Sequence, residues 1–410
     1  MFRRQFKVAG KISRARVYVC GQGYYELRLN GQKVGDHLLD PGFTRYDKRG
    51  LYVTYDVTPC LTERLNAVGV LLGHGWFNVQ TRAVWDFHKA PWRAAPKFLL
   101  MMYIEYADGR AAVISSDGTW KCATGPIVFN SIYGGETYDA RLEKPGWDLP
   151  GFDDSAWEPA KIVSAPKGVV SAQCMPPIRA TQTIKPVKIT EPSPGVFIYD
   201  FGQNFSGHVK LTASAPTGAK VVMKYGERLA EDGTLDRKDI EQHVVRTDAS
   251  QSFQTDSYIF KGGERETWES RFVYHGFQYV EVTGFPGRPT LDNLLGVFTH
   301  TDVPEAGQFE CSNPMLNKIW RAARWAYLSN LQSIPTDWPH REKNGWTGDA
   351  HLAAEVLHAM EARPDPPGGA ASRAEVWGQV ARLLLTPPED RYALACTYRR
   401  VWAPRVRLED

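Results

Sequence analysis

The sequence predicts a mainly β protein, in which two β-sandwich domains are followed by helices near the C-terminal end. Short runs that alternate apolar and polar residues, punctuated by Gly, Pro, Asn and Asp, fill the chain up to about residue 300. After Cys311 the apolar period changes to the helical spacing of about 3.6 residues. An acidic loop rich in Trp, Pro and Gly separates two such helical patterns. We therefore expect β modules that carry the start of a helical domain.

Composition is that of an ordinary folded protein. The 410 residues are 43% hydrophobic and 23% charged, which is enough chain for two or three domains. The net charge of +3 is small and the two signs are interspersed, so neither nucleic acid nor a membrane is expected as a partner. The longest apolar runs, 67–72 and 98–104, are far shorter than the roughly 20 residues of a membrane span.

The N-terminus begins with basic residues, but Gln5, Lys7 and Lys11 interrupt any apolar segment behind them. We therefore expect no signal peptide in the chain as written. This indicates a cytoplasmic location for that chain and leaves an exported, longer form open.

The six cysteines lack the spacing of a zinc site, so we expect no metal and no cofactor. Free buried thiols are favoured over a disulfide framework, because a chain of this length has core enough without covalent staples. The redox state of the thiols stays open. The cysteines are Cys20, Cys60, Cys122, Cys174, Cys311 and Cys396.

Residues 1–165 are expected to form the first β-sandwich. Apolar residues alternate through 14–36, and Asn30-Gly31 within this stretch is a strong hairpin signal. Further strands are expected at Leu51–Tyr55, Ala67–Leu72, Lys97–Tyr106 and Ala111–Ser115. Four tryptophans of this region are either a sugar-binding platform or core residues, and core is the more common use of Trp. They are Trp76, Trp85, Trp92 and Trp147.

A stretch with little periodicity, 165–177, is expected to link this domain to a second β-sandwich at 176–303. Strands are expected there at Phe197–Phe201, His208–Ala213, Lys220–Tyr225, Ser252–Lys261 and Phe277–Thr283. His208, His243 and His275 belong to no metal-ligand pattern, so each is interpreted as a structural residue.

A helical segment follows at 304–360. Asn313-Pro314 begins a helix that is expected to reach Gln332, with Leu316, Ile319 and Trp320 on its apolar face. After the acidic loop, Thr347 or Asp349 can cap a second helix, whose apolar stripe is Leu352, Val356, Leu357 and Met360. We expect these faces to stay partly exposed and to promote self-association, with Trp320 and Leu357 as contacts.

The acidic loop, 335–350, combines carboxylates with aromatic side chains. Pro and Gly break regular structure here, and functional side chains often lie on such loops. Glycosyl transfer needs a carboxylic acid to protonate the leaving oxygen and a second carboxylate to activate water, while Trp faces can stack on sugar rings. The alternative is a solvated charged loop, and spacing alone does not separate the two.

The run Thr336-Asp337-Trp338-Pro339-His340-Arg341-Glu342-Lys343-Asn344-Gly345-Trp346-Thr347-Gly348-Asp349-Ala350 resembles the catalytic motif of the inverting α-L-rhamnosidase family, Thr-Asp-Cys-Pro-x-Arg-Glu-Lys-x-Gly-Trp-x-Gly-Asp-Ala. It departs at Trp338, where most members carry Cys. The β regions also resemble the family's jelly-roll and second β modules, as at Glu136 to Arg141 and Asp200 to Gly207. The resemblance implies that the two helices open an (α/α)6 catalytic barrel.

The resemblance also implies roles for residues of the loop. Glu342 would be the general acid, Asp337 and Asp349 would hold sugar hydroxyls, and Arg341 and Trp346 would line the pocket. The substrate would be a terminal α-L-rhamnose on a glycoside or polysaccharide. The family's catalytic base is a Glu on a much later helix, and no residue of this chain matches its context.

The resemblance ends near Met360. Residues 361–410 contain eight Arg and no Lys, whereas 1–360 contain 22 Arg and 19 Lys, so this tail is expected to be foreign to the body and poorly packed. We interpret the chain as the front of an α-L-rhamnosidase-like hydrolase, inactive alone. The alternatives are a carbohydrate-binding protein without catalysis, which glycan binding by a chain neutralised at Glu342 would reveal, and a gene fragment, which sequencing of the downstream locus would reveal.

Overall fold

The computed structural model describes residues 1–83, 85–164, 168–244, 252–304, 308–346, 348, 350 and 353. The chain falls into two compact units. The first comprises Met1–Asp302, Leu328–Ile334 and Trp338–Lys343, and the second comprises Val303–Tyr327, Pro335–Asp337 and the chain from Asn344 onward. The prediction of a mainly β fold is confirmed, because three large sheets build the first unit.

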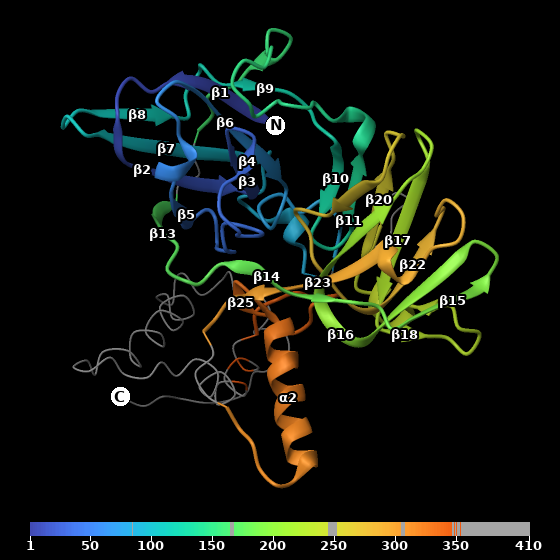
Figure 1. The fold of residues 1–410 in the computed structure, drawn as a ribbon. Coiled ribbons are helices and arrows are strands. Elements are labelled where there is room, and N and C mark those ends of the chain that lie inside the picture. Colours follow the sequence, from blue (N-terminus) through green and yellow to red (C-terminus); the bar gives the residue numbers. More distant parts are fainter. Residues whose placement is uncertain are drawn as a thin grey trace, which may run out of the picture. The chain divides into compact units, whose positions relative to one another are not determined.

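Two of these sheets form the N-terminal sandwich (Figure 1). The first sheet has the order β12 (Glu158–Pro159), β9 (Lys121–Cys122), β1 (Phe2–Lys7), β6 (Leu65–Gly73), β3 (Tyr24–Leu29) and β4 (Gln32–Lys33). The second has the order β13 (Val169–Ala172), β5 (Arg49–Asp56), β2 (Ile12–Gln22), β7 (Lys97–Tyr106) and β8 (Ala111–Ser115).

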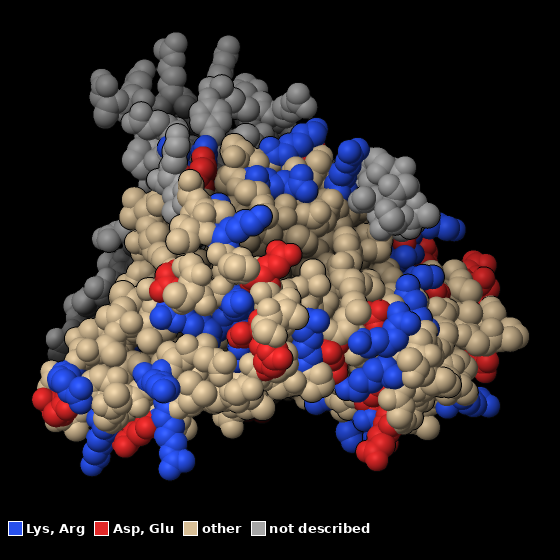
Figure 2. Space-filling view, turned by 90° about the horizontal axis from the view of Figure 1, so that it is seen from above, with Lys and Arg blue, Asp and Glu red and all other residues tan. Residues whose placement is uncertain are grey.

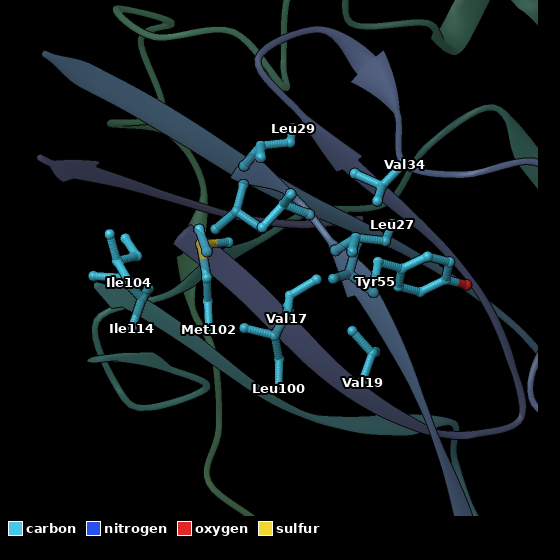
Figure 3. Close-up of a cluster of buried hydrophobic side chains, with 14 of the residues drawn as sticks. Val17, Val19, Leu27, Leu29, Val34, Tyr55, Leu100, Met102, Ile104 and Ile114 are labelled. Carbon is cyan, nitrogen blue, oxygen red and sulfur yellow. The ribbon is translucent and has the colours of Figure 1, made fainter. Parts of the chain in front are cut away.

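The core of this sandwich is made by the inward residues of both sheets. Val17 and Val19 on β2 and Leu100 and Met102 on β7 are buried against Leu27 on β3 (Figure 3). Strands with a period of two place alternate side chains on one face, so the alternation in the sequence is what fills this core. The strands expected at 97–106 and 111–115 are observed with those bounds.

The Asn30-Gly31 hairpin is observed between β3 and β4, where Leu29 pairs with Gln32. Asn30 has φ +50° and Gly31 has φ +85°. Two consecutive left-handed residues are the requirement of the tight turn whose twist matches that of the strands. The turn predicted from Asn30-Gly31 is therefore confirmed.

The third sheet contains ten strands and belongs to the second β region (Figure 1). Eight of them follow the order β10 (Ile127–Ser131), β11 (Gly135–Asp139), β20 (Thr255–Ile259), β17 (Lys220–Gly226), β22 (His275–Thr283), β16 (Val196–Ala213), β23 (Leu294–Thr301) and β14 (Ile178–Ile184). Both β15 (Lys188–Ser193) and β21 (Glu266–Glu269) pair with β16.

The expected strands Phe197–Phe201 and His208–Ala213 are one long strand, β16. The glycines between them predict a break, but Gly202 (φ +71°) lies in an irregularity where the pairing register with β22 shifts between Asp200 and Phe205. A bulge of this kind bends a strand without reversing it. The prediction of two strands was wrong for this reason.

Two further segments differ from the expected division at residue 165. The β10–β11 hairpin, placed in the first domain, joins the third sheet through a parallel pairing of β11 with β20. The expected linker contains β13, which pairs in parallel with β5 of the first sandwich. Neither segment carries a pattern that distinguishes one sheet edge from another, because partner choice is set by long-range packing.

The expected first helix is α2 (Pro314–Ser329), which ends three residues before Gln332. The remaining short α-helix and strands are α1 (Lys238–Glu241), β18 (Arg228–Leu229), β19 (Leu235–Asp236), β24 (Leu331–Gln332) and β25 (Ile334–Pro335). Four 3-10 turns complete the described elements: η1 (Thr58–Cys60), η2 (Phe87–Lys89), η3 (Ala140–Leu142) and η4 (Leu291–Asn293). None of the helices in the described part is long and apolar enough to cross a membrane. Of the expected second helix only Gly348, Ala350 and Ala353 are described, and the tail 361–410 lies outside the described residues.

Five cysteines lie in the described residues, and all five are free thiols. The expectation of burial holds for Cys20 alone among them; Cys60, Cys122 and Cys311 are half-buried and Cys174 is exposed. Figure 2 shows Lys and Arg interspersed with Asp and Glu on the face it presents. Such a face has no single-sign field that would steer a polyanion.

Gly207 should be irreplaceable in β16. It has φ +146°, and a Cβ atom there would lie 1.9 Å from the carbonyl oxygen of Val297. We expect Gly207→Ala to lower the free energy of unfolding by about 3 kcal/mol, measured by urea denaturation. Gly151→Ala is the control, since Gly151 (φ +81°) has no atom within 4 Å of the new Cβ and only backbone strain of about 1 kcal/mol applies. Equal losses in the two variants would contradict the steric argument.

The apolar side of α2 should cause self-association. Met315, Leu316 and Ile319 are 61%, 48% and 57% exposed. We expect the purified chain to sediment as concentration-dependent oligomers and to bind an apolar dye, and Ile319→Lys to reduce both. Lys318→Glu, a charge change on the same helix, should leave association unchanged. A wild-type chain that stays monomeric at high concentration would count against this expectation.

Candidate active site

Lys343 fixes Trp338–Lys343, the part of the acidic loop that belongs to the first compact unit, to the strands of that unit, which we call the β unit. Its Nζ donates hydrogen bonds to the carbonyl oxygens of Ile132 at 2.7 Å and Tyr274 at 2.5 Å, and it lies 3.9 Å from the centroid of the Tyr274 ring. The side chain is buried, and this burial lowers the pKa of Lys343 well below its usual value, although Asp256 opposes the shift. The residue also adopts φ +53°, a strained conformation for a side chain with a Cβ. Strong tertiary contacts are what hold such a backbone.

His340 provides a second attachment. It is buried, and its Nε2 lies 3.1 Å from Oε2 of Glu227, whose other oxygen accepts a hydrogen bond of 2.7 Å from Asn204. Burial opposes ionisation of Glu227, but the hydrogen bonds and the charge of His340 outweigh it and lower the pKa of Glu227. Pro339 packs so closely on Gly276 that a Cβ there would meet its Cγ at 2.6 Å.

Glu342 lies between these attachments. Tyr133 Oη donates a 2.7 Å hydrogen bond to its backbone carbonyl. Its carboxyl group, 15% exposed, accepts a 3.1 Å hydrogen bond at Oε2 from Nε1 of Trp85, and its Oε1 lies 3.7 Å from Nε2 of His243. The β unit therefore holds both the backbone and the side chain of this residue.

Arg341 and Trp338 lie beside each other on the same stretch. The guanidinium carbon of Arg341 is 4.4 Å from the centroid of the Trp338 ring, a cation–π distance. Trp338 is 42% exposed and tilts against His340, with ring centroids 5.4 Å apart. The bulky side chain at this departure from the motif is thus accommodated at the surface.

Asp337 and Trp346 belong to the second compact unit. Oδ2 of Asp337 accepts a 3.1 Å hydrogen bond from Nε1 of Trp346, and its Oδ1 accepts a 3.0 Å bond from the backbone N–H of Asn344. The Asp337 N–H in turn donates to the carbonyl of Asn344 at 3.0 Å. The structure thus brings Arg341 together with Glu342, and Asp337 together with Trp346, while Asp349 lies outside the described residues.

The residues that surround Glu342 in the fold are not indicated by any pattern in the sequence. The sequence favours a structural role for His243, but in the fold this residue faces the carboxyl group. The sequence indicates a platform or core role for Trp85, and it indicates no role for Tyr133 or Lys343. These partners come from as far as 257 positions away in the sequence, and neither spacing nor period encodes such a contact. The other two histidines are buried and pair with carboxylates, His208 with Glu269 and His275 with Asp256.

Comparisons with known proteins cover the chain from residue 10 to 362. The profile of the alpha-L-rhamnosidase N-terminal domain matches 10–182, that of the bacterial alpha-L-rhamnosidase concanavalin-like domain matches 190–300, and that of the bacterial alpha-L-rhamnosidase 6 hairpin glycosidase domain matches 304–362. An alpha-L-rhamnosidase of Formosa agariphila is 40% identical over 86% of this chain, and one of Streptomyces avermitilis is 41% identical over 88%.

Solved structures agree with these matches. The alpha-L-rhamnosidase from Dictyoglumus thermophilum superposes with a TM-score of 0.80 at 45% identity, covering 86% of this chain and 38% of that one. The Streptomyces avermitilis alpha-L-rhamnosidase complexed with L-rhamnose gives 0.80 at 39% identity, covering 87% and 35%. The β modules and the carboxylate loop follow the domain order of a family of modular glycoside hydrolases.

The chain belongs to the bacterial α-L-rhamnosidase family. The resemblance seen in the motif is thereby confirmed, as is the assignment to the glycoside hydrolases. The chain spans only 37% of the Formosa relative and 34% of the Streptomyces relative.

Lys343 should be essential for the stability of this loop attachment. We expect Lys343→Met, which keeps the length of the stem, to lower the free energy of unfolding by about 2–4 kcal/mol, because two buried carbonyls lose their donor. Lys261→Met is the control, since Lys261 is half-exposed where it pairs with Glu143, and a surface pair contributes less than about 1 kcal/mol.

The pH dependence gives a second measurement on the same variant. Because the folded pKa of Lys343 is depressed, the unfolded chain binds its proton more tightly, and wild-type stability should rise as pH increases between the folded and unfolded pKa values. Lys343→Met should lack this component of the slope. A stability loss in Lys343→Met no larger than that of Lys261→Met would show that Lys343 is not an anchor.

Proposed function

We propose that this chain is the general-acid-bearing part of an α-L-rhamnosidase that removes terminal α-L-rhamnose from glycosides or polysaccharides with inversion. The observation that carries the proposal is the placement of Glu342, which occupies the acid position of the family's motif. Its carboxyl group is mostly buried and is aligned by a hydrogen bond from Trp85. A general acid needs this kind of fixed orientation toward the leaving oxygen. The substrate and linkage rest on what the relatives are named for.

The remaining motif residues would bind the sugar. Asp337 and Asp349 offer carboxylate acceptors for rhamnose hydroxyls, and Arg341 and Trp346 offer a guanidinium donor and an indole face. The hydrogen bonds of Asp337 to Trp346 and to the Asn344 N–H support a preorganised acceptor. No metal or cofactor is required, because acid–base hydrolysis needs only two carboxyl groups and water.

An inverting enzyme places acid and base about 6.5–9.5 Å apart, so that water fits beneath the anomeric carbon. No stretch of this chain resembles the context of the family's base. We therefore infer that Glu342 can protonate the leaving oxygen, while the attacking water finds no partner within this chain. A general acid or a general base each typically raises the reaction rate by about 10²–10⁴-fold.

The test compares three proteins: the 410-residue chain, residues 1–360 joined to the C-terminal half of a family member, and the joined protein with Glu342→Gln. We expect negligible turnover of aryl α-L-rhamnosides by the first and robust turnover by the second. In the third, we expect kcat to fall at least 10²-fold on an aryl rhamnoside whose phenol leaving group has a high pKa. The loss should be smaller on an aryl rhamnoside with an activated phenol, which needs little protonation to leave.

Two results would contradict the proposal. Robust turnover by the 410-residue chain would reveal a base within it, and an unaffected Glu342→Gln variant would remove this residue from the role of acid. Rhamnoside binding by the 410-residue Glu342→Gln chain, with no turnover by the joined protein, would instead favour a carbohydrate-binding function without catalysis.

A further inference from the structure

Two side chains from the β unit meet the carboxyl group of Glu342. Trp85 lies on the connection between β6 and β7, and His243 lies two residues after α1. A backbone bridge between Ala83 and Val244 holds these two connections together, close to both side chains. The two segments that face the carboxyl group are therefore also paired with each other through their backbones.

The indole of Trp85 distinguishes the two carboxyl oxygens. An indole N–H is a donor only, so Oε2, at 3.1 Å, must act as an acceptor. In a neutral carboxyl group the unprotonated oxygen is the better acceptor. The contact therefore favours the proton on Oε1, the oxygen that faces His243.

His243 fits both protonation states of its neighbour. Burial lowers the pKa of His243, Arg341 and His340 act in the same direction, and Glu342 opposes them. A neutral imidazole nitrogen can accept from a protonated Oε1 or donate to an ionised one, according to its tautomer. The Nε2 to Oε1 distance of 3.7 Å is longer than a hydrogen bond, and contacts of this kind often tighten only in the substrate complex.

We propose that Trp85 and His243 are positioning residues, which keep the acid proton of Glu342 on Oε1 and stabilise the carboxylate left behind when that proton is transferred. This inference rests on the proposed role of Glu342 as general acid. In the step concerned, the Oε1–H bond breaks, the proton joins the glycosidic oxygen, and the electron pair of the breaking C–O bond goes to that oxygen. The indole hydrogen bond becomes charge-assisted as Glu342 ionises, so it is stronger in the transition state than in the ground state.

The contact is tested in the 410-residue chain by following the indole N–H signals in NMR spectra, with the Trp85 signal assigned through Trp85→Phe. We expect the chemical shift of this signal to change in Glu342→Gln, because the carboxyl oxygen that accepts the indole hydrogen bond is replaced. Trp92 provides the control within the same connection, because its Nε1 has no hydrogen-bond partner in the described part of the structure. A Trp85 signal indifferent to Glu342→Gln would overturn the inference.

The role is tested in the joined enzyme by varying the leaving group. We expect Trp85→Phe to lower kcat about tenfold, with KM nearly unchanged, on an aryl rhamnoside whose phenol leaving group has a high pKa. On an aryl rhamnoside with an activated phenol, kcat should fall less than about twofold. His243→Phe, which keeps a ring but removes both nitrogens, should show the same selectivity. Trp92→Phe should match wild type on both substrates, since it removes an N–H without an acceptor.

The outcomes distinguish the positioning role of Trp85 and His243 from the proposed role of Glu342 as general acid. An inactive joined enzyme, or one indifferent to Glu342→Gln, would overturn the proposed function and this role with it. An active, Glu342-dependent enzyme in which Trp85→Phe equals wild type on both leaving groups would overturn the positioning role alone. Equal losses on both leaving groups would mean that Trp85 supports the fold and not the proton transfer.

Discussion

The position of Trp338–Lys343 in the β unit depends on one buried lysine side chain. Lys343 is surrounded by protein, and an ammonium without partners there would cost several kcal/mol. Its hydrogen bonds to the carbonyls of Ile132 and Tyr274, and the ring face of Tyr274, supply those partners only when the loop occupies this place. The left-handed backbone at Lys343 is held by the same contacts. Because Glu342 directly precedes Lys343, the contacts of Lys343 also determine where Glu342 lies.

The anchor works because its acceptors are themselves rigid. Ile132 and Tyr133 connect β10 to β11, and Tyr274 precedes β22, all within a cluster of buried aromatic and aliphatic residues. Trp76 packs edge-on against Tyr133 in that cluster, with ring centroids 5.7 Å apart. A close-packed aromatic core has little freedom to shift, so its carbonyls and the hydroxyl of Tyr133 stay in place as hydrogen-bond partners for the loop.

Local patterns in the sequence predicted the local parts of this arrangement. Alternation predicted the strands and their buried faces, Asn30-Gly31 predicted its turn, and Asn313-Pro314 predicted the start of α2. The choice of partner strand could not be predicted, because β10 and β11 carry no signal for the third sheet and Gly202 looks like a break until β22 lies beside it. The motif likewise indicated Glu342, but its neighbours Trp85 and His243 became visible only when distant connections met. Residue spacing describes a segment, whereas the environment of a carboxyl group is a property of the packed fold.

The motif itself is divided between the two compact units. Trp338–Lys343, with Glu342, belongs to the β unit, while Asp337 and Asn344 to Trp346 belong to the other unit. Asp337 and Trp346, two of the residues proposed to hold the sugar, are thus bonded to each other, whereas the proposed acid is bonded to Trp85 of the β unit. Such a division lets the orientation of the acid be determined by the cluster of buried residues around Tyr133 and Tyr274, which forms through its own burial of apolar surface. A general acid gains from this arrangement, because a carboxyl group whose donors are fixed in advance requires no reorganisation when it gives up its proton.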